Sequence, residues 1–107
     1  MTGDLYRQAE QRYFSSDWAG AAELLEQVVA AEPRNLEAWV MLAAASRQLR
    51  RFARSAQAYE RAIELDPENT VWRQHLVHVH EQAGRYDEAA AAEAEVGTGG
   101  PTPATSG

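Results

Sequence analysis

A repeat with a period of 34 residues is the feature that most constrains this chain of 107 residues. Aromatic residues stand one period apart at Trp18, Phe52 and Tyr86. Pro33 and Pro67 keep the same interval, and each follows an acidic residue and precedes an asparagine by two positions. Repeat periods of about 20 to 50 residues are typical of solenoids, in which each unit buries its apolar face against its neighbours.

Each unit is predicted to be a pair of helices joined by a turn. In the second unit, Asn35 is placed to cap the first helix, since its side-chain oxygen can accept from free backbone N–H groups. The inward face of that helix follows the i, i+3, i+4, i+7 spacing of an amphipathic helix: Trp39, Leu42, Ala43 and Ser46. Pro67 ends the second helix, because proline removes a helical hydrogen bond.

The third unit is predicted to follow the same plan. Gly84 is expected to end its first helix, because helices often end with a residue in the left-handed conformation and glycine adopts that conformation with the least strain. His80 stands in the place of Ser46 and is expected to pack inward. The last helix, over residues 87–96, is rich in alanine and glutamate. We expect it to close the array with a polar outer face.

These motifs make the chain resemble the tetratricopeptide repeat family over residues 2–96. The second unit carries the pattern most fully, and the third lacks the leading tryptophan, with Arg73 at its expected place beside Trp72. The resemblance implies an all-α fold, a right-handed α-α superhelix (solenoid) of three helix-turn-helix repeats at about 2–35, 36–69 and 70–96. Residues 97–107, rich in glycine, proline and threonine, are expected to be a disordered tail.

The resemblance also implies that the first helix of each pair lines a concave groove that holds a peptide or helix of a partner protein. The residues left for that groove once the inward positions are assigned are Tyr6, Glu10, Tyr13, Val40, Met41, Ala44, Arg47, Gln74, His75, His78 and Glu81. Tyrosine and arginine are frequent binding anchors, and methionine adapts to irregular surfaces. The sequence therefore favours a protein-binding adaptor or scaffold.

One branch of the family grips the free carboxylate at a chaperone's C-terminus with lysine, asparagine and arginine side chains. The matching positions in this chain lack that set of cations and amides: Tyr6, Glu10, Met41, Val71 and His75. Only a protonated His75 would supply a cation. We therefore do not expect this chain to be a co-chaperone adaptor of that kind.

Composition excludes several other classes of function. The formal net charge of −6 disfavours sequence-independent binding of nucleic acid, which requires a cationic surface. The chain has no cysteine, so it has neither disulfides nor thiolate chemistry. No catalytic motif and no glycine-rich phosphate loop is found, so no enzyme activity and no cofactor are expected. Lacking a signal peptide and a membrane-length apolar run, the chain is expected to be cytoplasmic, with no membrane partner.

Two clusters have a functional and a structural interpretation. His75 and His78 lie on one helical face, but two imidazoles without a carboxylate or thiolate make a weak metal site, so no metal is expected. Basic residues gather near one turn: Arg47, Arg50, Arg51 and Arg54. Cations at a helix C-terminus complement the helix dipole, and the alternative is a handle for an acidic partner segment or phosphate.

The alternative function is a self-associating structural module that oligomerises through the alanine-rich last helix. Ala90, Ala91 and Ala94 would allow two copies to approach closely. Glu93 and Glu95 would bring like charges together in such a dimer. A monomer is therefore expected over a homo-oligomer.

Overall fold

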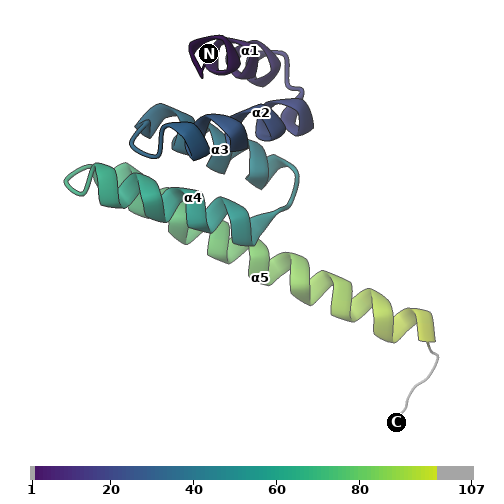
Figure 1. The fold of residues 1–107 in the computed structure, drawn as a ribbon. Coiled ribbons are helices and arrows are strands. Elements are labelled where there is room, and N and C mark those ends of the chain that lie inside the picture. The colour runs from purple at the N-terminus through teal and green to yellow at the C-terminus, as the bar shows by residue number, and fades with distance from the viewer. Residues whose placement is uncertain (1, 99–107) are drawn as a thin grey trace.

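The computed structural model describes residues 2–98, and side chains over residues 3–88. This part of the chain is entirely helical, with no strand among the described residues. Its five helices are α1 (Thr2–Phe14), α2 (Trp18–Ala31), α3 (Leu36–Gln48), α4 (Phe52–Leu65) and α5 (Thr70–Thr98). Successive helices lie side by side and stack into an elongated body (Figure 1). The prediction of an all-helical stack is confirmed.

The first two turns repeat the same backbone geometry at the 34-residue offset. Ser16 and Arg50 are both left-handed, with φ of 64° and 63°. Two helix starts carry a side-chain cap, and the one predicted at Asn35 is confirmed. The Asp17 side chain accepts from the Gly20 N–H, and the Asn35 side chain accepts from the Ala38 N–H. These local signals fix where α2 and α3 begin.

Small residues form the seams where the helices meet. Fully buried alanines recur along the stack: Ala9, Ala21, Ala38, Ala43, Ala45, Ala58 and Ala62. Ser55 is also buried, and its hydroxyl donates to the Ala43 carbonyl at 2.8 Å. Small side chains let α3 and α4 approach closely, and the hydrogen bond satisfies a polar group that burial would otherwise destabilise. Leu25, Val28, Leu42 and Val79 supply the larger core side chains.

Proline turns are tied to the helix that follows them in both the second and the third unit. The Trp39 indole donates to the Pro33 carbonyl at 2.7 Å. One repeat later, the Arg73 guanidinium donates to the Pro67 carbonyl at 2.8 Å. The same backbone acceptor is therefore bound although arginine replaces tryptophan. Trp72, one position earlier, donates to the Asp66 carboxylate at 3.0 Å.

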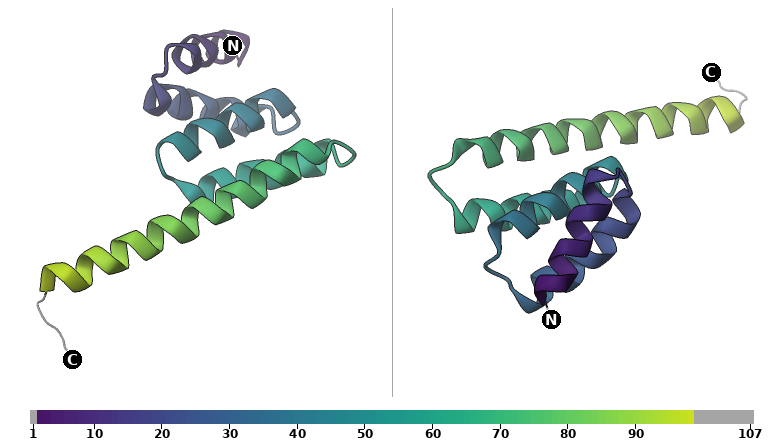
Figure 2. Two further views of the ribbon diagram at one scale, coloured as in Figure 1. Left: turned by 180° about the vertical axis from the view of Figure 1, so that it is seen from behind. Right: turned by 90° about the horizontal axis from the view of Figure 1, so that it is seen from above.

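The predicted third hairpin is wrong, because α5 continues from Thr70 to Thr98 without a turn. Gly84 lies inside this helix, although it occupies the repeat position at which Ser16 and Arg50 are left-handed. The second half of α5 extends away from the other helices (Figure 2). Glycine inside a helix costs about 1 kcal/mol relative to alanine, but the alanine- and glutamate-rich sequence after it strongly favours helix.

Two bulky residues at the seam give a second reason for the straight helix. Val77 and His80 stand where the second unit has Ala43 and Ser46. Larger side chains prevent the close approach that the α3–α4 pair makes. His80 is exposed, so the prediction that it packs inward is wrong. The neighbouring Val79 is fully buried instead, because the core-facing stripe of α5 runs through Leu76 and Val79.

The predictions for the C-terminal segment fall at the edge of the described structure. Helix α5 includes residues 97 and 98, which were expected to belong to the disordered tail. Residues 99–107 lie outside the described residues, as do the side chains of the predicted polar outer face beyond Glu88. Among the described helices, none combines the length and the apolar character needed to cross a membrane.

Replacing Gly84 with alanine tests the continuity of α5. We expect Gly84→Ala to stabilise the protein by about 1 kcal/mol, because alanine is the better helix former. A gain of that size raises Tm by about 4–8 °C in a domain of this size. No atom lies within 4 Å of the position that the added Cβ would take. Circular dichroism measures the shift.

The matched control is Ser16→Gly, at the equivalent left-handed position. There glycine relieves the strain of a left-handed residue, and we expect no loss of Tm. A lower Tm for Gly84→Ala would contradict the continuous helix, since alanine is disfavoured in a left-handed turn.

Candidate functional site

Two hollows open along the face to which α3 contributes, one toward each end of that helix. The first is mainly apolar, with a volume of about 350 Å³. Its lining comes from α1, α3 and the start of α5: Tyr6, Glu10, Phe14, Leu36, Glu37, Val40, Met41 and Trp72. Apolar walls with a few polar groups at the edge are typical of sites that receive a partner's side chain.

Tyr6 forms one wall of this apolar hollow. Its hydroxyl contacts the Met41 sulfur at 3.8 Å, which joins α1 to α3 across the groove. Burial raises the pKa of Tyr6, and the neighbouring carboxylates of Glu10 and Glu37 raise it further. The phenol therefore stays neutral at physiological pH. Phe14, which is 75% exposed, adds an open aromatic side chain at the rim.

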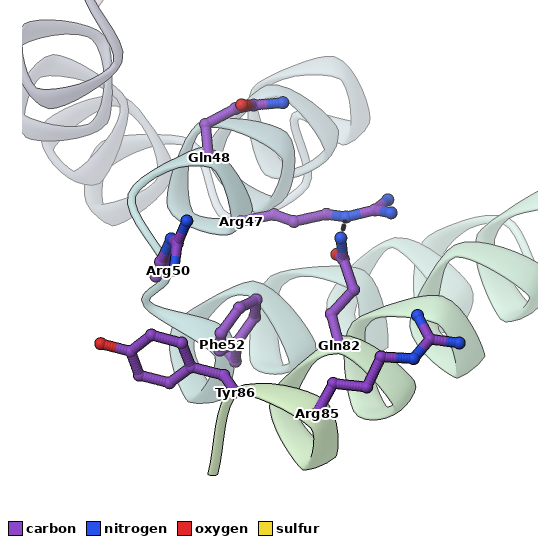
Figure 3. A pocket seen from close by; sticks show the side chains of 7 residues that line it. All are labelled: Arg47, Gln48, Arg50, Phe52, Gln82, Arg85 and Tyr86. Carbon is purple, nitrogen blue, oxygen red and sulfur yellow. Dashed lines mark hydrogen bonds between the residues drawn. The ribbon is translucent and has the colours of Figure 1, made fainter. Parts of the chain in front are cut away.

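The second hollow is basic, with a volume of about 670 Å³. It is lined by Arg47, Gln48, Arg50, Phe52, Gln82, Arg85 and Tyr86, from the α3–α4 turn and the middle of α5 (Figure 3). Arg47 donates to the Gln82 side chain, which holds its guanidinium in place. Arg50 lies over the Tyr86 ring at 5.3 Å from its centroid. Three guanidinium groups around one opening favour an anionic ligand group.

The arginines near this turn divide into structural and free groups. Arg54 binds Glu26 through two hydrogen bonds of 2.8 and 2.6 Å and lies 5.6 Å from the centroid of the Trp39 ring. It therefore fastens α4 to α2. Arg51 is exposed at the start of α4 and lines neither hollow. Arg47 and Arg50 remain at the basic hollow, where Arg85 joins them.

His75 is held between two aromatic rings and is not an open metal ligand. Its ring stacks on Tyr59 at 5.3 Å and lies 6.2 Å from Trp72, measured between centroids. Burial lowers the pKa of His75, and the charges of Arg47 and His78 lower it further. The neutral imidazole is therefore the favoured form. Within the described residues, no group of three histidine, cysteine or acidic side chains is arranged to hold a metal ion.

The structure distributes the predicted groove residues among several environments. Tyr6, Glu10, Val40 and Met41 line the apolar hollow, and Arg47 lines the basic one. Ala44 is half-buried between them on α3. The remaining predicted residues line neither hollow: Tyr13, Gln74, His75, His78 and Glu81. Tyr13 packs edge-on against Trp18 at 5.3 Å between centroids, and Gln74, His78 and Glu81 are exposed on α5.

Ten residues that line the hollows are absent from the predicted groove: Phe14, Leu36, Glu37, Gln48, Arg50, Phe52, Trp72, Gln82, Arg85 and Tyr86. Trp72 was set aside because it stands one position from the repeat register. Arg85 and Tyr86 were not predicted because the expected turn at Gly84 places them after the first helix of the third unit. Gln82 precedes that turn and lies beside the predicted stripe, which passes through Glu81. A helix that continues through Gly84 brings Gln82, Arg85 and Tyr86 onto one face at i, i+3 and i+4.

The half-buried position of His75 between two rings predicts its titration. We expect His75 to titrate below about 6.5 in an NMR experiment. Arg47→Gln should raise that pKa without restoring the usual value, since burial is the larger cause. The lowered folded-state pKa contributes stability that is present above the unfolded value and is lost as pH falls through the folded value.

The control is Arg61→Gln, which removes an exposed α4 arginine that is not among the charges acting on His75. It should leave the His75 titration unchanged. A pKa at or above the usual histidine value would contradict the stacked, desolvated environment.

Comparison with known protein families agrees with the repeat and with the fold. Two family models described as tetratricopeptide repeat match residues 6–70 and residues 46–96. The first match alone covers more than half of the chain. No curated protein matches the chain at a significant level. On the family matches, together with the stacked helix pairs, this chain belongs to the tetratricopeptide repeat family.

Proposed function

We propose that this chain is an adaptor or scaffold that holds a segment of a partner protein across the groove along α3. Tetratricopeptide repeats generally mediate protein–protein interaction and are not catalytic. The observation that carries the proposal is the pairing of two hollows of different chemistry on one helix. An apolar hollow takes a side chain of the partner, and a basic hollow takes an anionic group.

The spacing of the hollows suggests which segments fit. Val40 and Arg47 lie seven positions apart on α3, which is about 10 Å along a helix axis. An extended peptide covers this length in about three residues, and a helical one in about seven. The preferred segment therefore has a large apolar residue and an acidic residue at one of these spacings. Glu10 and Glu37 at the apolar hollow favour a basic residue beside the apolar anchor.

The size of the groove sets the expected strength of binding. Each hollow accepts one or two side chains, so the contacts are few and open to water. An affinity on the order of micromolar fits such a surface. The pairs of Tyr6 with Met41 and Arg47 with Gln82 hold the walls in place before binding, which limits the entropy lost on association.

Two single substitutions test the two hollows separately. Val40→Glu puts a carboxylate into the apolar hollow, and Arg50→Glu reverses an exposed charge at the basic one. Each should weaken binding of a partner captured from native lysate, and then of its isolated segment, by about tenfold or more. The loss from Arg50→Glu should be larger at low salt, because salt screens exposed charges. Isothermal titration calorimetry with the segment gives both values.

The control is Gln27→Glu, an exposed change on α2 outside both hollows. It should leave binding unchanged, and circular dichroism should show that all three variants remain helical. A partner that binds both groove variants as tightly as wild type, or that is lost with Gln27→Glu, would move the site to another face.

A further inference from the structure

One face of α5 lies open where the equivalent face of α3 is covered by α4. Ala43 and Ser46 are 0% and 1% exposed on α3. The residues one repeat later are Val77, which is 53% exposed, and His80, which is also exposed. Val77 is thus a large apolar side chain in water at a position where the preceding repeat has a buried alanine. The turn that would have covered it is absent because α5 runs straight through Gly84.

The open positions form a continuous line along the helix, here called the α5 stripe. It consists of Arg73, Val77, His80, Gly84 and Glu88, all described as exposed. Steps of three and four residues keep the side of an α-helix constant. The sequence carries the same steps on to Ala91 and Glu95. Arg73 and His80 therefore precede Gly84 on this line, and acidic residues follow it.

We propose that the α5 stripe binds the α5 stripe of a second copy of this chain, with the two helices antiparallel and crossing at Gly84. The positions are symmetric about that glycine, three pairs lying four, seven and eleven residues to either side. In this register Val77 stands opposite Ala91, His80 opposite Glu88 and Arg73 opposite Glu95. The contact is self-complementary, as a two-fold axis requires.

Charge selects the antiparallel arrangement. The Arg73 end of each stripe meets the acidic end of the other, whereas a parallel pair would place Arg73 against Arg73 and Glu88 against Glu88. Gly84 meets Gly84 at the crossing, where the lack of a side chain permits close approach. Glu81 and Asp87 flank the stripe and oppose each other across the pair, so their repulsion keeps the dimer weak.

A hollow beside the stripe gives the second helix a place to lie. It has a volume of about 410 Å³ and is lined by Phe52, Ala53, Ala56, His80, Ala83 and Asp87, from α4 and α5. Four of these six residues are apolar, and a neighbouring helix would remove them from water. The residues that follow Asp87 do not fold back over it, because they continue the same straight helix to Thr98.

This proposal replaces the expectation of a monomer, which rested on repulsion between the acidic last helices of two copies. The antiparallel register places Glu95 opposite Arg73 and thereby removes one of those repulsions. It also leaves the groove open. The α5 residues that line the two hollows lie about 100° or more around the helix from the stripe, since the helix turns by about 100° per residue: Trp72, Gln82, Arg85 and Tyr86.

Mass in solution tests the pairing directly, by light scattering and sedimentation of the full chain from about 1 µM to 1 mM without any groove partner. We expect a shift from 11.8 kDa to about twice that mass as concentration rises. Val77→Glu should weaken dimerisation by about tenfold or more. Val71→Glu, a matched change of a 43% exposed valine on the other side of the helix, should not.

Charge reversal tests whether the two helices pair in the proposed register or whether a substitution only damages the fold. Glu88→Arg should weaken the dimer, and adding His80→Glu in the same chain should restore it. A monomer at every concentration would overturn the proposal, as would a dimer indifferent to Val77→Glu or one that the double reversal fails to restore. None of these results depends on groove binding, so each proposal can fail alone.

Discussion

The close contact of helices through alanine and serine is the constraint on which this structure depends. Ala43 is fully buried between α3 and α4, and its carbonyl accepts from the Ser55 hydroxyl at 2.8 Å. Such a seam leaves no room for a larger side chain. Where the sequence replaces Ala43 and Ser46 with Val77 and His80, the seam is not formed and the chain continues as one helix. The same small-residue contact thus explains the repeats and the place where they stop.

The helical stack, its turns and its caps could be predicted from sequence because their causes are local. Asn35 caps α3, Pro33 and Pro67 stand between helices, and the buried face of α3 follows its spacing. The third unit could not be predicted in this way. Gly84 is compatible both with a turn and with a continuous helix. Which of the two forms depends on how much apolar surface a second helix would bury if the chain folded back at Gly84. Glu93 stands where the second unit has the buried Tyr59, so the return offers little apolar burial.

Part of the candidate site could also be predicted from local sequence patterns. Tyr6, Val40, Met41 and Arg47 follow from helical spacing once the inward face is known, and all four line a hollow. Arg85 and Tyr86 follow only from the straight course of α5. The pairing of Arg54 with Glu26, far apart in the sequence, likewise needs the three-dimensional stack. Surfaces formed by residues that are far apart in the sequence are the hardest to predict from sequence patterns.

Both proposed surfaces depend on the straight course of α5. It brings Arg85 and Tyr86 to the basic hollow, and it leaves Val77 uncovered on the other side. A hairpin at Gly84 would turn Arg85 and Tyr86 into a second helix and would cover the stripe. The conformation of this one segment therefore determines whether the chain offers one binding face or two.

The most direct test is a distance within α5, and the absence of native cysteine makes it simple to label. Cysteines introduced for Gln74 and Ala94 would carry spin labels, in chains diluted into unlabelled protein so that only one chain is measured. A continuous helix predicts a backbone separation of about 30 Å between these positions, at about 1.5 Å per residue. A separation of about 10 Å, the distance between packed helices, would mean that the chain folds back at Gly84 and would contradict this account.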